Sequence, residues 1–227
     1  MEVPKLGPGL RPLVTVDVVI FTLRQDELRV LLIRRGHPPH QGMWAIPGGS
    51  VQPDEALEAA AMRRLEEETG LVDVYLEQLY TFGDPDRDPR DRIITVAYFA
   101  VVPPTGEVPP AEKQEHVRWW SIYQLPPLAF DHDQVLSYGL TRLRYKLEYT
   151  AVGFELLPAE FSLTELQTAY EIVLGERLDK RNFRRKILGA GIIEPSGQYR
   201  TGDGRPARLY RYREDAVAEV KARRLFP

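Results

Sequence analysis

The sequence predicts an α+β protein in which a mixed α and β domain is followed by a winged helix-turn-helix domain. Strand-like runs surround a central helix between residues 14 and 150, and two short helices with a hairpin follow at 151–227. The net charge also changes sign between these two parts. We expect residues 1–13, which are rich in proline and glycine, to form a flexible lead-in.

Composition is that of an ordinary globular protein, with 227 residues, 43% hydrophobic and 28% charged. The absence of cysteine excludes disulfides, thiolate metal sites and cysteine nucleophiles. The four histidines show no metal-ligand spacing. No apolar run approaches the ~20 residues of a membrane span, and the N-terminus lacks the pattern of a signal peptide. A cytoplasmic location without a membrane partner is therefore expected.

Charge is distributed unevenly along the chain. Residues 1–150 contain 16 Lys and Arg against 22 Asp and Glu, whereas residues 151–227 contain 14 against 11. Within the second part, residues 177–213 hold 11 basic and 3 acidic side chains. Such asymmetry fits a polyanionic partner for the basic part, or equally a basic face that is simply solvated.

The first domain is expected to begin with strands. Apolar runs at 14–23 and 28–33, separated by the turn-like segment 24–27, predict an antiparallel pair. Residues 44–49 predict a short strand that runs into a glycine turn. Further strands are expected at 74–82, 93–102 and 116–121, with a charged loop at 84–92.

Two helices are expected in the same domain. The first should begin near Pro53, because proline suits the first helical position and the acidic residues after it suit the helix dipole. Gly70 suits its C-terminal end. Its buried stripe is expected to be Leu57, Ala60, Ala61 and Leu65. The second helix, at 133–149, has an apolar side formed by Val135, Leu136, Leu140, Leu143 and Leu147.

The second domain has the pattern of a winged helix. Ser162 and Glu165 form a capping box, and that helix should end at Gly175. Asp179 can cap a second helix that ends at 188–189, and the connection between the two helices is short, as helix-turn-helix geometry requires. Strands are expected at 192–194 and 208–213 around a tip at 196–206, followed by a short helix at 214–224.

A motif for nucleotide chemistry overlaps the first helix. Gly49, five residues, Glu55, seven residues, Arg63 and then R-L-E-E-E-T-G-L resemble a Nudix box. Every defined position of that family pattern is present except the glutamate after the arginine, which is Arg64 here. The resemblance implies a Nudix α/β/α sandwich for residues 14–150.

The substitution at Arg64 changes the chemistry that the motif can support. Positions 64, 67 and 68 share one helix face, where carboxylates would hold Mg²⁺ against a substrate diphosphate. Arg64 cannot ligate a metal, but it can pair with Glu67 or Glu68. The resemblance implies that the lost glutamate is a metal ligand, or in some relatives the general base. We therefore expect impaired hydrolysis, no required cofactor and at most low Mg²⁺ occupancy at Glu67 and Glu68.

Other residues are candidates for binding a ligand. From the motif we take Gly49 and Arg63, and from the charged loop Arg87 and Arg90, which could grip a diphosphate or equally pair with neighbouring aspartates. Trp44 could stack on a base, although a place in the core is the favoured interpretation.

The second helix of the winged domain is basic on one side. Phe183, Ile187 and Leu188 are expected to face inward. Arginine can read guanine and asparagine can read adenine in the major groove, while other cations neutralise phosphates. The DNA-binding candidates are Lys180, Arg181, Asn182, Arg184, Arg185, Lys186 and, at the wing tip, Arg205.

The two domains together resemble the Nudix-related transcriptional regulators of NAD metabolism, the NrtR family. The resemblance rests on stretches at 87–90, 125–132, 157–171, 182–186 and 204–210. It implies a homodimeric repressor of NAD biosynthesis or salvage genes that binds a double-stranded operator and releases it when ADP-ribose occupies the Nudix domain.

Two other functions stay open from the residues alone. The chain could be an active Mg²⁺-dependent ADP-ribose pyrophosphatase with an accessory domain, a function against which Arg64 argues. It could instead be a sugar-responsive catabolic regulator with the same fold. An RNA-binding module is disfavoured because the sequence shows no aromatic stacking platform.

Overall fold

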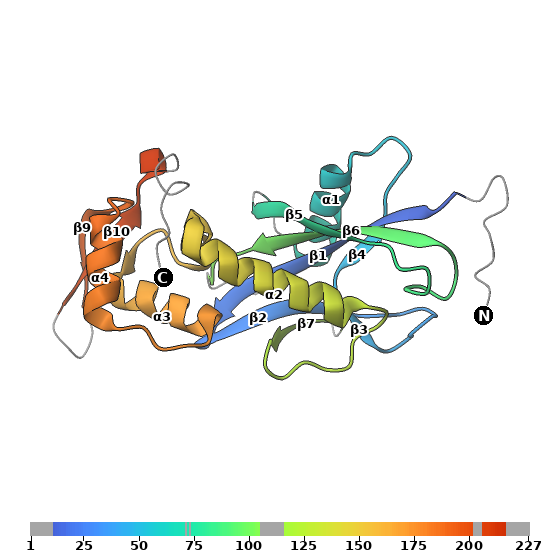
Figure 1. Cartoon of the computed structure of the whole chain (residues 1–227), viewed down its shortest axis with the longest axis horizontal. Coiled ribbons are helices and arrows are strands. Elements are labelled where there is room, and N and C mark those ends of the chain that lie inside the picture. The colour runs from blue at the N-terminus through green and yellow to red at the C-terminus, as the bar shows by residue number, and fades with distance from the viewer. Residues whose placement is uncertain (1–10, 71, 73, 105–115, 202–205, 217–227) are drawn as a thin grey trace.

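The computed structural model describes residues 11–70, 72, 74–104, 116–201 and 206–216. A mixed sheet with helices on both faces is followed along the long axis by a smaller winged helix-turn-helix unit (Figure 1). The predicted fold class is therefore confirmed. The strands of the larger sheet are β1 (Leu13–Arg24), β2 (Glu27–Arg34), β3 (Trp44–Ala45), β4 (Gly48–Ser50), β5 (Tyr75–Phe82), β6 (Ile93–Val101) and β7 (Val117–Ser121).

The larger sheet is built around strand β1. Its order is β3-β2-β1-β6-β5, with β4 paired to β1 and β7 paired to β2. Strands β1 and β6 run parallel over nine residue pairs, and the other pairings are antiparallel. The predicted turn between the first two strands consists of Gln25 and Asp26, which both have positive φ, as a type I′ hairpin turn requires.

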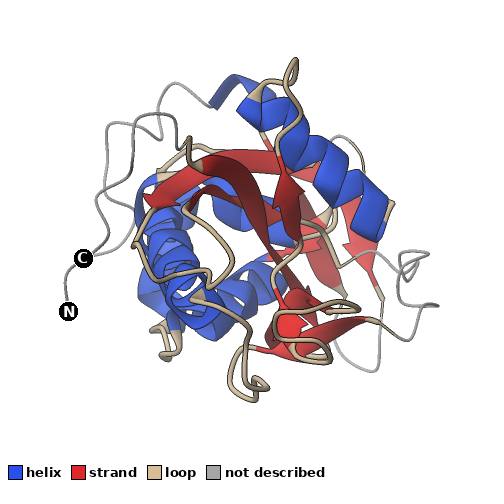
Figure 2. Ribbon diagram, turned by 90° about the vertical axis from the view of Figure 1, so that its right-hand side faces the viewer, coloured by secondary structure: helices blue, strands red, loops and turns tan. Residues whose placement is uncertain are grey.

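Helices cover both faces of this sheet (Figure 2). Helix α1 (Leu57–Thr69) buries Ala60, Ala61 and Leu65 against one face, and the two small residues let the helix approach the strands closely. Helix α2 (His132–Tyr149) covers the opposite face, where the predicted leucine and valine stripe is buried or half-buried. No helix in the described ranges is long and apolar enough to cross a membrane.

The predicted start of helix α1 is wrong by about one turn. The helix begins at Leu57 rather than near Pro53, and Ala56 at its N-cap position has extended backbone. The cause is Glu55, whose carboxylate accepts a hydrogen bond from the backbone N–H of Gln52 at 3.2 Å and two more from Arg63. These contacts hold residues 52–55 as a separate turn. Gly70 ends the helix in the left-handed conformation, as predicted.

The second unit contains the expected helices and one additional strand. Its elements are the 3₁₀ helix η2 (Ala151–Leu156), β8 (Phe161–Ser162), α3 (Leu163–Leu174), α4 (Lys180–Gly189), β9 (Ile193–Arg200), β10 (Ala207–Tyr212) and the 3₁₀ helix η3 (Glu214–Ala216). The capping box of Ser162 and Glu165 is confirmed, and Asp179 caps α4 by accepting from Asn182 N–H. The three strands pair in the order β8-β10-β9.

Three details of this unit differ from the prediction. Strand β9 extends to Arg200, so residues 196–200 belong to the strand rather than to the tip. Leu188 is 49% exposed, because helical rotation carries it away from buried Phe183 and Ile187. The expected terminal helix shows only its start, η3, since residues 217–227 lie outside the described residues. Arg205 and residues 1–10 of the expected lead-in at 1–13 also lie outside them, and Leu13, the last residue of that lead-in, already belongs to strand β1.

One continuous apolar core joins the two units. It runs from Val19 and Phe21 in the larger sheet to Phe183 and Ile193 in the winged unit. At the junction Leu147 of α2, Gly153 of η2 and Tyr170 of α3 are packed so closely that a Cβ on the glycine would lie 2.6 Å from the leucine side chain and 2.9 Å from the tyrosine ring. The glycine is required here by lack of space.

Replacing Gly153 with alanine is expected to lower the free energy of unfolding by about 1–3 kcal/mol, the usual effect of overpacking a core. Urea unfolding monitored by circular dichroism measures the change. Gly36→Ala is the matched control, because nothing lies within 4 Å of a Cβ built there. Equal stability of the two variants would contradict the packing argument.

Candidate nucleotide site and DNA-binding surface

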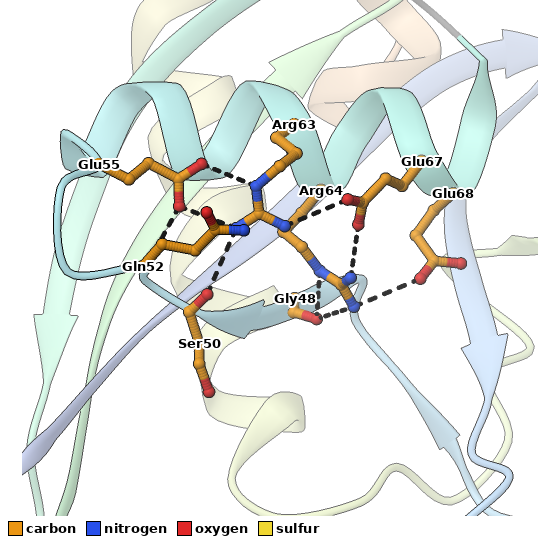
Figure 3. Close-up of polar contacts among 8 residues, drawn as sticks. All are labelled: Gly48, Ser50, Gln52, Glu55, Arg63, Arg64, Glu67 and Glu68. Atoms are coloured by element: carbon orange, nitrogen blue, oxygen red, sulfur yellow. Dashed lines mark hydrogen bonds and ion pairs between the residues drawn. The ribbon is translucent and has the colours of Figure 1, made fainter.

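Arg64 occupies the face of α1 on which the Nudix pattern places carboxylates (Figure 3). Its Nε and Nη2 atoms donate to the carbonyl oxygen of Gly48 at 2.9 and 2.6 Å. Its Nη1 atom donates to Glu67 at 2.6 Å, and Nη2 lies 3.5 Å from Glu68. The two pairings that helical spacing predicts are therefore both present. The guanidinium fills the space between the helix and the glycine turn.

The glycine turn is shaped by the charged groups around it. A Cβ on Gly49 would lie 2.7 Å from Nε of Arg64, and a Cβ on Gly48 would lie 2.1 Å from a carboxylate oxygen of Asp17. Any side chain at either position would displace a charged neighbour. The two glycines thus allow Arg64 on one side and Asp17 on the other to approach the backbone closely.

Arg63 of helix α1 connects the helix to the glycine turn through hydrogen bonds. It forms two hydrogen bonds with the Glu55 carboxylate, at 2.7 and 2.8 Å, and further ones with Glu67 at 3.2 Å and the Ser50 carbonyl at 3.4 Å. The hydrogen bonds from Arg63 lower the pKa of Glu55 to about 2 and raise the pKa of Arg63 itself. All three nitrogens of this predicted ligand-binding residue therefore contact protein oxygens.

The residues at this face do not fit the Mg²⁺ that the resemblance to a Nudix box implies. Burial alone would raise the pKa of Glu67, but hydrogen bonds from Arg63 and Arg64 lower it, so its charge is balanced by arginines. Within the described ranges, no group of three His, Asp or Glu side chains could hold a metal ion. The donor set here is two carboxylates opposed by a cation, which repels a second cation at the same place.

The charged loop contributes a second cluster, which is largely buried. Arg87, 8% exposed, donates to both carboxylate oxygens of Asp131 at 2.9 and 2.7 Å, and its guanidinium lies 3.6 Å from Asp17. Arg90 instead pairs with Asp88 at 3.0 and 2.6 Å. The two arginines therefore differ: Arg87 ties the loop to the start of α2, whereas Arg90 remains half-exposed.

The aromatic ring of Phe130, a residue that the sequence analysis did not single out, lies beside Arg90 and Arg35. The guanidinium carbons of Arg35 and Arg90 lie 4.6 and 5.7 Å from the centroid of Phe130, and His40 meets that ring edge-on. Phe130 has φ of 56°, an uncommon conformation for a bulky residue. A cavity of about 670 Å³ opens here and is lined by His40, Asp84, Pro85, Asp86, Arg87, Pro89, Phe130, Asp131 and Gln134.

Asp17 and His132 were also missed by the sequence analysis. Both are buried, and His132 accepts a hydrogen bond at Nδ1 from the backbone N–H of Ile46 while its Nε2 lies 3.9 Å from Asp17. An aspartate inside the apolar run at 14–23 was the available signal. Trp44, by contrast, packs half-buried against the core and meets Trp120 edge-on at 5.3 Å, in agreement with the favoured core interpretation.

All the predicted DNA-binding residues except Arg205, which lies outside the described residues, are on helix α4 of the winged unit. Phe183 and Ile187 are buried against the core of the unit. Lys180, Arg181 and Arg185 are exposed on the helix surface. Arg185 donates to the Asn182 side chain at 2.7 Å, and Arg184 reaches Thr164 of α3 at 3.2 Å. The helix therefore presents cations and an amide together.

Comparison with known proteins agrees with this two-part architecture. Residues 13–138 match the NUDIX domain family, and residues 153–212 match the NrtR DNA-binding winged helix domain. The ADPR responsive transcriptional repressor NtrR of Acinetobacter baylyi is 42% identical over 205 residues, which cover 88% of this chain and 82% of that protein. The chain belongs to the NrtR family.

Both domains of this NrtR family member are similar to solved structures of complexes. NrtR of Shewanella oneidensis complexed with a 27mer DNA has a TM-score of 0.83 and 36% identity, covering 90% of this chain and 95% of that one. The NUDIX domain of the same protein complexed with ADP ribose has a TM-score of 0.53 and 37% identity, covering 59% of this chain and 89% of that one.

The buried histidine of this family member predicts a pH dependence of stability. Burial lowers the pKa of His132 below its usual value, so the unfolded chain binds a proton that the folded chain does not. The free energy of unfolding should therefore fall as the pH decreases below about 6.5, by at most about 1.4 kcal/mol per pH unit from this group.

Urea unfolding between pH 7.5 and 5 of the wild type and of His132→Asn measures this contribution. The variant should show a shallower dependence on pH. His37→Asn, at an exposed position, serves as the control and should keep the wild-type slope. A slope unchanged in His132→Asn would show that another group is responsible.

Proposed function

We propose that this chain is an ADP-ribose-responsive repressor of NAD biosynthesis or salvage genes, in which the Nudix domain senses the ligand and the winged helix binds the operator. The observation that carries the proposal is the combination of a basic, capped helix α4 with a Nudix site whose metal-binding face holds Arg64. The ADPR responsive repressor of Acinetobacter and the Shewanella structures with DNA and with ADP ribose support the sensing and DNA-binding parts of this proposal.

We further propose that ligand binding no longer leads to efficient hydrolysis. Cleavage of a diphosphate needs charge neutralisation and an activated water at the carboxylate face. Arg64 can supply a fixed positive charge there, but it cannot deprotonate or ligate a metal. Mg²⁺ is accordingly not required, and any occupancy at Glu67 and Glu68 is low.

The ligand-binding surface is proposed to combine the glycine turn with the loop cluster. Gly49 and Arg63 lie at the first, Arg87 and Arg90 at the second, and Asp17 contacts both through Gly48 and Arg87. Of these, Arg90 offers a half-exposed guanidinium for a phosphate. A related nucleotide or a sugar is the alternative effector, and a screen of ligands distinguishes them.

We propose that the protein acts as a homodimer in the cytoplasm, with residues 14–150 as the sensing domain and 151–227 as the DNA-binding domain. A dimer would set two α4 helices about 34 Å apart, one turn of DNA, on an operator with two-fold symmetry. Lys180, Arg181, Asn182, Arg184, Arg185 and Lys186, together with Arg205, are the proposed contacts to DNA.

Operator binding tests the DNA half of the proposal. The wild-type protein should select a duplex with two half-sites from a random-sequence pool and should release it when ADP-ribose is added. Arg181→Ala should weaken binding by about 1–3 kcal/mol, measured by fluorescence anisotropy at fixed salt. Arg34→Ala, an exposed arginine at the end of β2 in the first domain, should leave the affinity unchanged. Failure to select any duplex would contradict a repressor function.

Hydrolysis tests the role of Arg64. Titration of ADP-ribose into the wild-type protein with Mg²⁺ should show binding without release of AMP. Arg64→Glu restores the third carboxylate of the helix face and should produce Mg²⁺-dependent AMP, whereas Arg64→Gln, which only removes the charge, should not. Catalytic turnover by the wild type would instead identify the chain as a working pyrophosphatase.

A further inference from the structure

Two side chains of the first domain donate hydrogen bonds to the C-terminal end of helix α3. Arg144 of α2 donates from Nε to the carbonyl oxygen of Val173 at 2.9 Å. Tyr123, in the loop that leads to α2, donates from its hydroxyl to the carbonyl oxygen of Ile172 at 3.4 Å. A Cβ on Gly175, which ends the helix, would lie within 4 Å of both side chains. Both hydrogen bonds are therefore made with the last turn of α3.

The C-terminal end of a helix interacts favourably with cationic hydrogen-bond donors. The last four carbonyl groups of an α-helix lack partners within the helix, and together they carry partial negative charge. A half-buried guanidinium there contributes a charge-assisted hydrogen bond as well as a favourable interaction with the helix dipole. Arg144 thus fixes the position of α3 relative to α2.

The position of α3 in turn determines that of the DNA-binding helix α4. Glu171 accepts from the backbone N–H of Leu178 at 2.9 Å, and Gln167 donates to the carbonyl of the same residue at 3.0 Å, so the turn between the helices is held by α3 side chains. Tyr170 of α3 also meets Phe183 of α4 edge-on at 5.6 Å. Helix α4 is therefore carried by α3 through the turn and through the core.

The opposite end of α2 begins at the ligand side of the molecule. Asp131, at its N-cap position, takes two hydrogen bonds from Arg87, and His132 is held by Ile46. Arg87 also lines the cavity beside Phe130. Figure 1 shows α2 running from this side of the sheet to the winged unit. One rigid helix of 18 residues thus connects the ligand cluster to the Arg144 contact.

We propose that Arg144 is the positioning residue through which ligand occupancy of the Nudix domain changes the placement of α4, and hence the affinity for DNA. This inference rests on the proposed function. Ligand contacts at the start of α2 change the position of that helix. The hydrogen bond from Arg144 to Val173 transmits this change to the C-terminal end of α3. Without Arg144 the two binding activities persist, but the coupling between them is reduced.

The test compares wild type, Arg144→Met, Arg144→Lys and Arg142→Met. Arg142 lies on the same helix but interacts with Leu79 and Glu77 of the first domain, so it is the matched control. ADP-ribose affinity of the free protein is measured by calorimetry, and the affinity for a duplex selected by the wild type is measured with and without saturating ADP-ribose. The ratio of the two DNA affinities is the coupling factor, typically about 5- to 150-fold.

In Arg144→Met the coupling factor should fall to within about threefold of unity, while the affinity for ADP-ribose stays within about twofold of wild type. Arg144→Lys, which keeps the charge but not the planar donor, should retain an intermediate factor, and Arg142→Met the full one. An unchanged factor in Arg144→Met, or parallel loss of ligand and DNA binding, would overturn the inference. If the wild-type protein binds DNA with the same affinity in the presence and absence of ADP-ribose, the proposed effector is wrong, and the coupling role of Arg144 is contradicted together with it.

Discussion

The packing of helix α2 against both domains is the constraint on which the rest of the structure depends. Its leucines close one face of the large sheet, and Leu147 reaches the junction where Gly153 leaves no spare volume beside Tyr170. Since protein interiors are close-packed and resist small deformations, a shared core of this kind transmits displacement instead of absorbing it. The two domains are therefore mechanically connected, which suits a protein that must relate the occupancy of one site to the geometry of another.

The nucleotide site differs from the Nudix pattern at one position of its carboxylate face. Arg64 lies on the helix face that would otherwise carry a third carboxylate, and it is held by Gly48, Glu67 and Glu68. A guanidinium keeps positive charge at this place without the capacity to activate water. The glycine turn and the Arg63–Glu55 pair that frame the site are kept beside it.

The winged unit is organised around local signals that are strong on their own. Ser162 and Asp179 satisfy backbone donors at the starts of α3 and α4, and Gly175 ends α3 in the left-handed conformation. These caps define the ends of the two helices through contacts within a few residues. What the tertiary contacts add is orientation: Tyr170 and Phe183 pack the helices together, and Arg144 holds the pair against the first domain.

The sequence by itself determined the order and type of the main elements, the Nudix pattern with its Arg64 departure, and the basic helix α4, because periodicity, caps and motif spacing act within a few residues. Only the tertiary structure decided that helix α1 starts at Leu57, that Arg87 is buried against Asp131 while Arg90 is half-exposed, and that Phe130 and Asp17 border the ligand side. These features depend on partners that are far apart in the sequence, such as Arg87 and Asp131 with a separation of 44 residues, or on competing side-chain hydrogen bonds. Local sequence patterns carry no information about such long-range partners, which are chosen by packing of the whole fold.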